Sequence, residues 1–296
     1  MTDIQQHHNL ELSNQYYQQG TLEKDLWFQV ATRDYTELIN AFDFRTFFSR
    51  FDSPMELLDI GCGTGKFPSM LASRLSPTIQ VHYDYLDPSE HSLEELRKSL
   101  TTPFTPRTAL RKTVETLEQS AGPAQGYQVI WCVQSLYCLQ HHALEAVMKT
   151  LKALLNVRNG VALIYLASSQ AWYHRLYNVY NQEVYPNLRQ PYITAENVLT
   201  ILDRLHISYE VNKLHFPHTI PCSDQEILNN YINQCVFDTD AWERSQSSRP
   251  IQALLDSYRN EESYQFPQQV WLIGFTRDGE RTGDWRHDFK LSSHMK

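Results

Sequence analysis

The feature that most constrains the fold is a glycine-rich turn between a hydrophobic strand pattern and an amphipathic helix pattern. Residues 57–67 read LLDIGCGTGKF, in which Asp59 sits near the end of the apolar run and Gly61, Gly63 and Gly65 follow in the spacing G-x-G-x-G. Glycines at such a turn permit positive φ angles and let a ligand approach the backbone closely. We therefore expect a nucleotide-like cofactor to bind here.

Three kinds of ligand compete for this turn, and two of them do not fit the residues. A P-loop has four residues between its first glycine and Gly-Lys, followed by a hydroxyl residue, but Gly61 is too close to Gly65 and Phe67 stands at the hydroxyl position. A dinucleotide fingerprint reads G-x-G-x-x-G, and Asp59 would repel a pyrophosphate. S-adenosylmethionine (SAM) has an ammonium and a sulfonium and no phosphate, so it suits a turn that follows an acid. A structural turn without a ligand is the remaining alternative.

A second acid follows the next strand pattern. The segment VHYDYL ends just before Asp87, which lies about twenty residues beyond the glycine turn. An acid at this place accepts hydrogen bonds from the two hydroxyls of a cofactor ribose. The pair of signals predicts SAM as the cofactor and S-adenosylhomocysteine as its product.

Strand and helix patterns alternate along the chain on both sides of the turn. The strand patterns lie at residues 55–60, 81–87, 108–114, 127–134 and 161–168, and the helix patterns between them at 65–75, 89–100 and 142–155. Such alternation predicts a doubly wound parallel α/β sheet with helices on both faces. Further on, we expect a helix at 192–205, a strand at 207–216, helices within 223–262 and a last strand at 270–276.

These patterns divide the chain into three parts. Residues 1–53 form an N-terminal helical segment, residues 54–277 the cofactor-binding domain with a helical insertion at about 222–262, and residues 278–296 a polar tail. A net charge of −8 argues against nucleic acid or an anionic membrane as the main partner. The N-terminus lacks a signal-peptide pattern, and five cysteines without a CxxC pair suggest free thiols, so we expect a cytoplasmic protein. We also expect a monomer that acts on a small molecule, with an oligomer as the open alternative. The histidine pairs at 7–8 and 141–142 have no partners at metal-ligand spacing, and we expect no metal.

The chain resembles the class I SAM-dependent methyltransferases, and among them the histamine N-methyltransferase family over most of its length. The segments that carry the resemblance are LDPSEHSLEEL, YQVIWCVQSLYCL, SSQAWYHRLYNVY and QPYITAENVLTILDRLHISYE. The resemblance implies a seven-stranded sheet with its last strand antiparallel. It also implies N-terminal helices and C-terminal insertions that close a small-substrate pocket over the carboxyl edge of the sheet.

The resemblance also implies roles for particular residues. On the cofactor side it points to the loop glycine Gly61, the ribose acid Asp87, Ser92 on the next helix, the region from Thr113 to Glu115, and Val133 and Gln134 at the end of the fourth strand. On the substrate side it points to Glu23 for a cationic amine, Gln268 in place of a substrate-binding asparagine, and Tyr137, Trp172 and Tyr177 in the pocket wall. Glu23, Tyr137 and Gln268 are thereby the catalytic candidates. Cys138 stands where the family tends to have a second aromatic residue.

The function that follows is transfer of a methyl group from SAM to a nitrogen of a small amine, imidazole or guanidine compound. An aromatic wall favours such cationic or flat acceptors through cation–π and stacking contacts. Two alternatives stay open, an O- or carboxyl methyltransferase on the same fold and a SAM-binding protein without activity. A nucleic-acid methyltransferase is disfavoured by the acidic charge and by the absence of an [ND]-P-P-[YFW] motif.

Overall fold

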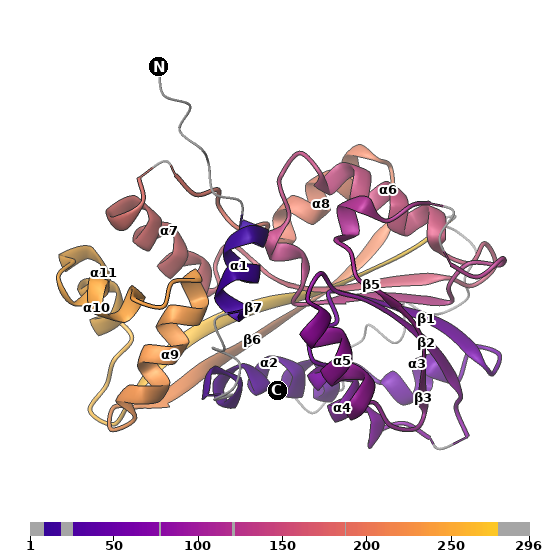
Figure 1. Cartoon of the computed structure of the whole chain (residues 1–296), viewed down its shortest axis with the longest axis horizontal. Coiled ribbons are helices and arrows are strands. Elements are labelled where there is room, and N and C mark those ends of the chain that lie inside the picture. Colours follow the sequence, from indigo (N-terminus) through magenta and orange to yellow (C-terminus); the bar gives the residue numbers. More distant parts are fainter. Residues whose placement is uncertain (1–8, 19–25, 77, 120–121, 187, 278–296) are drawn as a thin grey trace.

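The computed structural model describes residues 9–18, 26–76, 78–119, 122–186 and 188–277. Its centre is a seven-stranded sheet in the order β3-β2-β1-β4-β5-β7-β6 (Figure 1). The strands are β1 (Met55–Ile60), β2 (Val81–Leu86), β3 (Phe104–Leu110), β4 (Val129–Val133), β5 (Val161–Ala167), β6 (Tyr209–Pro221) and β7 (Ser263–Thr276). Strands β1 to β5 pair in parallel, and β7 pairs antiparallel with both β5 and β6. The predicted doubly wound sheet with an antiparallel last strand is confirmed.

Helices cover both faces of this sheet. The core on one face includes residues of α2 (Leu26–Ala41), α3 (Phe44–Phe48), α4 (Lys66–Ala72) and α5 (Glu90–Ser99). The core on the other face includes residues of α6 (Leu144–Leu154) and α8 (Ala195–Arg204). Two short 3₁₀ turns, η1 (Val114–Thr116) and η2 (Leu136–Cys138), follow β3 and β4. Both faces of β1, β4 and β5 are therefore buried, as their nearly continuous apolar sequences require.

A third core lies where β6 and β7 extend beyond the rest of the sheet. These two long strands pair from Tyr209↔Phe275 to Pro221↔Ser263. The helices around their far end are α1 (Asn9–Gln18), α7 (Trp172–Val184), α9 (Gln225–Val236), α10 (Ala241–Gln246) and α11 (Arg249–Asp256). In Figure 1, α7, α9, α10 and α11 lie on the left, and α1 lies nearer the centre. The insertion between β6 and β7 thus builds a helical wall beside the sheet.

Local sequence signals explain several of the helix starts. The Oγ of Ser89 accepts a hydrogen bond from the backbone N–H of Ser92 at 3.2 Å and caps α5. Thr194 and Asn197 form a reciprocal capping box at the start of α8. Such caps satisfy backbone groups that a helix end leaves unpaired, so they fix where these helices begin.

The third strand differs from the prediction, which placed it at residues 108–114. The structure has β3 at Phe104–Leu110, with Pro106 opposite Tyr83 of β2. Proline weakens a strand pattern because it has no N–H to donate to the ladder. It is tolerated here because β3 is the edge strand of the sheet, and the edge position could not be known from the local sequence.

None of the helices in the described part of the chain is long and apolar enough to span a lipid bilayer.

Candidate active site

A cavity of about 260 Å³ opens at the carboxyl ends of β1, β2 and β4. Its lining residues come from the loops after these strands and from α1, α2, α7 and α9. Doubly wound sheets bind ligands at this edge because loops there diverge to opposite faces. The cavity therefore joins the glycine turn to the N-terminal helices and to the helical wall between β6 and β7.

The glycine turn has the backbone that its sequence predicts. Gly61, Gly63 and Gly65 have φ angles of 67°, 53° and 77°, in the left-handed region that side chains disfavour. A Cβ atom on Gly61 would lie 2.4 Å from the Cβ of Ser135, whereas a Cβ on Gly63 would meet no atom within 4 Å. The turn is therefore packed tightly against the β4 loop at Gly61, and Gly63 leaves room in which a ligand can approach the backbone.

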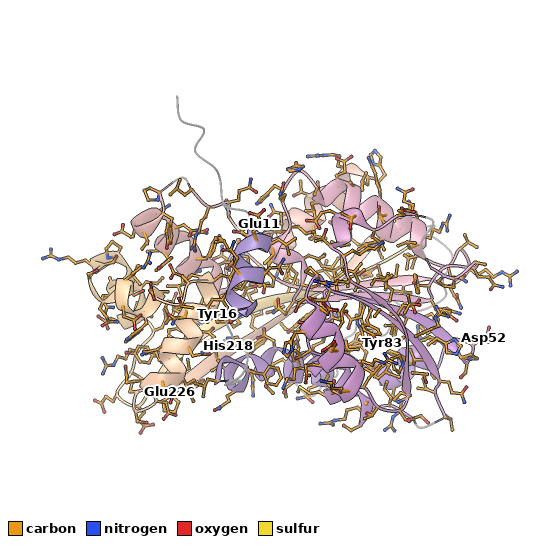
Figure 2. All side chains as sticks on the ribbon, in the orientation of Figure 1. Glu11, Tyr16, Asp52, Tyr83, His218 and Glu226 are labelled. Carbon is orange, nitrogen blue, oxygen red and sulfur yellow. The ribbon has the colours of Figure 1, made fainter. Side chains whose placement is uncertain are left out.

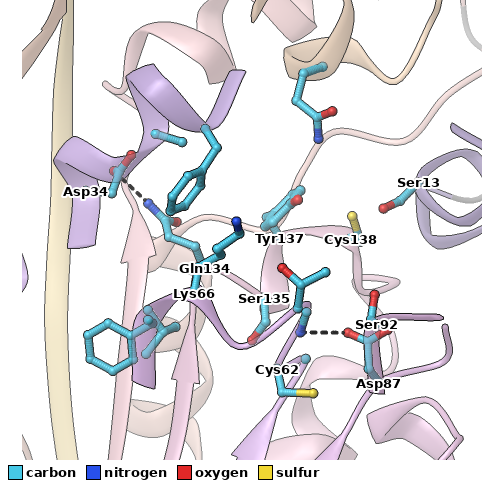
Figure 3. Close-up of a pocket in the computed structure, with 18 of the residues that line it drawn as sticks. Ser13, Asp34, Cys62, Lys66, Asp87, Ser92, Gln134, Ser135, Tyr137 and Cys138 are labelled. Atoms are coloured by element: carbon cyan, nitrogen blue, oxygen red, sulfur yellow. Dashed lines mark hydrogen bonds between the residues drawn. The ribbon is translucent and has the colours of Figure 1, made fainter. Parts of the chain in front are cut away.

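Asp87 stands beside this turn after β2 and lines the cavity. Its Oδ2 accepts a hydrogen bond from the N–H of Gly63 at 3.0 Å (Figure 3). Its Oδ1 accepts one from the N–H of Ser89 at 2.9 Å. Each carboxylate oxygen has a second lone pair, so each can accept one further hydrogen bond from a ligand hydroxyl. Burial raises the pKa of Asp87, while the two backbone hydrogen bonds act in the opposite direction.

Asp59, at the end of β1, is a nearly fully buried carboxyl that also lines the cavity. Its Oδ2 accepts a hydrogen bond from the hydroxyl of Tyr83. Burial raises the pKa of Asp59 to about 7, against the lowering effect of the hydrogen bond from Tyr83. A cation bound in the cavity would favour the ionised form and would lower this pKa.

Gln134 follows β4 in a left-handed conformation, with a φ of 52° that is uncommon for a residue with a side chain. Its backbone N–H donates to the carbonyl of Tyr165 at 2.8 Å, and its side-chain Nε2 donates to Oδ1 of Asp34 at 3.0 Å (Figure 3). The Oε1 atom is buried and has no hydrogen-bond partner among the described residues. A buried acceptor without a partner at a cavity wall is suited to a ligand that donates a hydrogen bond.

Asp34 on α2 belongs to a buried hydrogen-bonded chain that was not predicted from the sequence. Its Oδ2 lies 2.8 Å from Nε2 of His218, and Nδ1 of His218 lies 2.7 Å from the hydroxyl of Tyr231. All three residues line the cavity, and Figure 2 shows His218 on the side of the molecule that carries α9. A local signal existed for His218, since it occupies a buried position of a strand, β6, in which buried and exposed residues alternate.

The remaining wall of the cavity is aromatic. Tyr137, Tyr173, Tyr192 and Phe237 line it, from η2, α7, the loop before α8 and the end of α9. The ring of Tyr137 stacks on Phe237 with centroids 6.1 Å apart and meets Tyr192 edge-on at 5.3 Å. Tyr137 thus lines the cavity, and so does Cys138 beside it.

Three predicted substrate residues stand behind the lining residues rather than on the cavity surface. Trp172 stacks on Phe266 at 3.7 Å, with its ring also stacked 5.8 Å from Tyr231. Tyr177 stacks on Tyr192 at 3.7 Å, and Gln268 lies buried next to Tyr231. They support the wall, because helix and strand registers turn their side chains into the third core.

The other predicted residues divide in the same way. Ser92, Val133, Gln134, Asp59, Asp87 and the glycines Gly61 and Gly63 line the cavity, whereas Gly65 is buried under Leu96 and Ser99 at the start of α4. Thr113 and Glu115 lie at η1, outside the cavity lining, and Glu115 is exposed. Glu23 lies outside the described residues. The expected contact after the third strand does not reach this cavity, because η1 packs toward the other face of the sheet.

The cysteines and the charges of the site complete its chemistry. All five cysteines are free thiols, and burial raises the pKa of Cys62 in the turn well above its ordinary value, so it stays protonated. Among the described residues, no group of three or more histidine, cysteine or acidic side chains could hold a metal ion. The described lining residues include three carboxyls, Asp34, Asp59 and Asp87, and one lysine, Lys66.

Comparisons with known proteins agree with this geometry. A family model described as a methyltransferase domain matches residues 32–205. No curated protein sequence matches the chain significantly. Among solved structures, the YcgJ protein from Bacillus subtilis has a TM-score of 0.52 at 14% identity, covering 84% of this chain and 100% of its own. An inferred methyltransferase from Bacillus halodurans has a TM-score of 0.50 at 12% identity, covering 78% of this chain and 96% of its own.

A protein of Thermotoga maritima, described as a SAM-dependent methyltransferase and possible histamine N-methyltransferase, has a TM-score of 0.49 at 14% identity. The match covers 89% of this chain and 98% of that protein. At such identities a structural likeness shows the fold alone, because one fold supports many chemistries. The nature of the acceptor has to be argued from the residues of the cavity.

Proposed function

The chain belongs to the family of class I SAM-dependent methyltransferases, and we propose that it methylates a nitrogen of a small cationic amine, imidazole or guanidine metabolite in the cytoplasm. The cofactor is SAM, which supplies an electrophilic methyl group on a sulfonium. The residues at the turn fit it. Gly63 leaves space for close approach to the backbone, Asp87 has free lone pairs for ribose hydroxyls, and Asp59 is a buried carboxyl that suits the amino-acid end.

The observation that carries the proposal is the character of the cavity beyond the turn. It is bounded by the carboxyl of Asp34, the unpartnered Oε1 of Gln134 and the rings of Tyr137, Tyr173 and Tyr192. A carboxylate and π-faces attract a cation, and the amide oxygen can accept a hydrogen bond from an N–H. The same groups repel a carboxylate acceptor, which disfavours carboxyl methylation.

In this arrangement the protein accelerates methyl transfer by holding the acceptor nitrogen in line with the methyl group and by excluding water. Asp34 and Gln134 would orient the nitrogen from the α2 and β4 sides of the cavity, and the aromatic wall would hold the rest of the acceptor. Lys66 is turned to the ring of Phe28, with its Nζ 4.9 Å from the ring centroid. Among the described lining residues, the three carboxyls of Asp34, Asp59 and Asp87 outnumber this one lysine.

The direct test is to incubate the purified protein with SAM and a panel of amines, imidazoles, guanidines, phenols and carboxylic acids. Release of S-adenosylhomocysteine and the product mass are measured together. We expect turnover on one or more nitrogen compounds that are cationic at neutral pH. Turnover confined to phenols or carboxylic acids would overturn the proposal, as would SAM binding without turnover on any member of the panel.

A variant separates acceptor recognition from cofactor binding. Asp34→Asn removes the carboxylate charge from the acceptor side while leaving the residues of the glycine turn unchanged. It should raise KM for a cationic acceptor by at least tenfold, while the Kd for SAM stays within about twofold. The matched control is Asp52→Asn, which removes a charge from an exposed aspartate before β1 and should change neither constant.

A further inference from the structure

The buried chain Asp34–His218–Tyr231 links three distant segments of the molecule at the acceptor side of the cavity. Asp34 comes from α2, His218 from the far half of β6 and Tyr231 from α9. The sequence separation between Asp34 and His218 is 184 residues, and the two side chains meet at 2.8 Å. Buried polar groups need partners, so each of these side chains has its position set by the others.

The hydrogen bonds of Gln268 indicate the direction in which protons are donated along this chain. Gln268 Nε2 donates to the carbonyl of Phe266 at 3.2 Å, which orients the amide, and the same Nε2 lies 3.4 Å from the Tyr231 oxygen. The Tyr231 oxygen therefore accepts from Gln268 and donates its own hydrogen to Nδ1 of His218. With Nδ1 as the acceptor, the ring carries a proton on Nε2, where it donates to Asp34.

Asp34 is held at the end of this chain by a second donor. Its Oδ1 accepts from Nε2 of Gln134 at 3.0 Å, so its Oδ2 is directed to His218. A carboxylate in this place stabilises an imidazolium when Nδ1 takes up a proton. Tyr231 is part of the cavity wall, and its hydroxyl also interacts with the thiol of Cys235. A thiol is a weak hydrogen-bonding group, so an ammonium bound at this wall would compete with it for the phenol oxygen.

We infer that Tyr231 removes the proton from the cationic nitrogen of the acceptor before that nitrogen is methylated. His218 receives the hydroxyl proton of Tyr231, and Asp34 holds His218 in position. This inference rests on the proposed function and states that the acceptor enters in its protonated form. An N–H bond of the ammonium breaks and its proton passes to the Tyr231 oxygen, while the Tyr231 hydroxyl proton passes to Nδ1 of His218. The freed lone pair then forms the N–CH₃ bond, and the sulfur keeps the electron pair of the C–S bond.

The proton ends on an imidazolium paired with the Asp34 carboxylate, and no free tyrosinate forms. We call this path from Tyr231 to His218, with Asp34 as the partner of His218, the relay. It is needed because Tyr231 alone is a poor base at neutral pH, as burial raises its pKa well above the ordinary value and keeps the hydroxyl protonated. The other titratable groups near the relay are Tyr35 of α2, Tyr173 of α7 and Cys235 of α9. Burial raises the pKa of each of them, so they stay neutral.

The test compares acceptors that arrive protonated with acceptors that arrive neutral. The variants are Tyr231→Phe, which removes the hydroxyl, and His218→Gln, which can still donate to Asp34 but cannot take the proton. The nitrogen compound that the wild-type protein methylates is compared with a fluorinated analogue of the same shape. The nitrogen of this analogue is already unprotonated at the assay pH. The control is Tyr264→Phe, a buried tyrosine of β7 outside the cavity lining, which should behave as wild type.

Both variants should lower kcat on the protonated acceptor by on the order of 10²-fold, the range of general base catalysis. On the neutral analogue they should retain most of the wild-type rate, and the Kd for SAM should stay within about twofold. The pH–rate profile on the protonated acceptor should shift so that activity recovers at higher pH, where the acceptor loses its proton unaided. An equal loss on both acceptors, or no loss on either, would overturn the relay.

The relay and the proposed function fail in different ways. If the wild type methylates phenols instead of nitrogen compounds, the proposed function is wrong, and a pair of phenols of high and low acidity decides the relay with the same variants. If the wild type turns over nothing, ¹⁵N NMR of His218 decides it. A neutral ring protonated on Nε2 at neutral pH agrees with the relay, and a ring protonated on Nδ1 overturns it.

Discussion

We expect the ionised carboxyl of Asp59 to lower the free energy of unfolding at neutral pH and to raise the affinity of the protein for SAM. Burial raises the pKa of this carboxyl from its ordinary value of 3.8 to about 7. The folded state therefore binds the Asp59 proton more tightly than the unfolded state does, and the stability this provides is complete below about pH 4 and is lost as the pH rises to 7. Above pH 7 the ionised carboxyl costs the empty protein about 4 kcal/mol relative to a neutral group in the same place.

The substitution Asp59→Asn removes this cost and keeps an oxygen that can accept the hydrogen bond from Tyr83. We expect the free energy of unfolding of the variant, relative to wild type, to increase by roughly 2–3 kcal/mol between pH 5 and pH 7.5. Any packing penalty of the asparagine is independent of pH and cancels in this comparison. The measurement is urea unfolding at the two pH values, followed by tryptophan fluorescence and extrapolated linearly.

The same substitution should weaken cofactor binding, because the variant cannot offer a carboxylate to a cation. The loss should be about 10- to 100-fold in Kd for SAM at pH 7.5, the range of a charge-assisted hydrogen bond. In the wild type the affinity for SAM should rise between pH 5 and pH 7 as Asp59 ionises, and in the variant it should not. A stability difference between the two proteins that does not change with pH would refute the assignment of a raised pKa to Asp59.

Three further predictions concern the rest of the site. Asp87→Ala should weaken SAM binding by roughly 1–3 kcal/mol in calorimetry, because ribose hydroxyls would lose buried acceptors, and an unchanged Kd would remove Asp87 from the cofactor site. Gly61→Ala should lower the free energy of unfolding by about 2–3 kcal/mol, since its Cβ would lie 2.4 Å from Ser135 Cβ on a left-handed backbone. Its control Gly63→Ala adds no clash and should destabilise the fold less. Glu23→Gln should raise KM for a cationic acceptor far more than the Kd for SAM, and if neither constant moves, Glu23 has no role in acceptor binding.

The cofactor half of the site was predictable because its signals are local. The turn from Asp59 to Gly65 needs positive φ angles, and glycine is the residue that supplies them without strain. Asp87 follows directly from the end of the next strand, and parallel strands place their carboxyl ends at one edge of a sheet. The positions of Asp59, Gly63 and Asp87 around one cavity thus follow from patterns within about thirty residues.

The acceptor half was less predictable because its residues meet through long-range packing. Trp172 and Tyr177 were expected in the pocket wall and Gln268 at the substrate, and the structure turns all three toward the core behind Tyr231 and Tyr192. A helical or strand pattern shows which positions are buried but not whether a buried side chain faces a cavity or a neighbouring helix. The third strand was predicted at the wrong residues for a related reason. A strand can contain a proline such as Pro106 when it lies at the edge of a sheet, and the local pattern does not show which strand is at the edge.

The sequence by itself determined the alternation of strands and helices, the glycine turn and its two acids, and hence a SAM-binding α/β fold. Only the tertiary structure decided that Asp34 meets His218 and Tyr231 at the acceptor side of the cavity. The physical reason is that local periodicities, 3.6 residues in helices and two in strands, orient side chains relative to their own element. Which elements then face one another depends on the β6–β7 hairpin and the helices that pack on it, and that arrangement has no local signature.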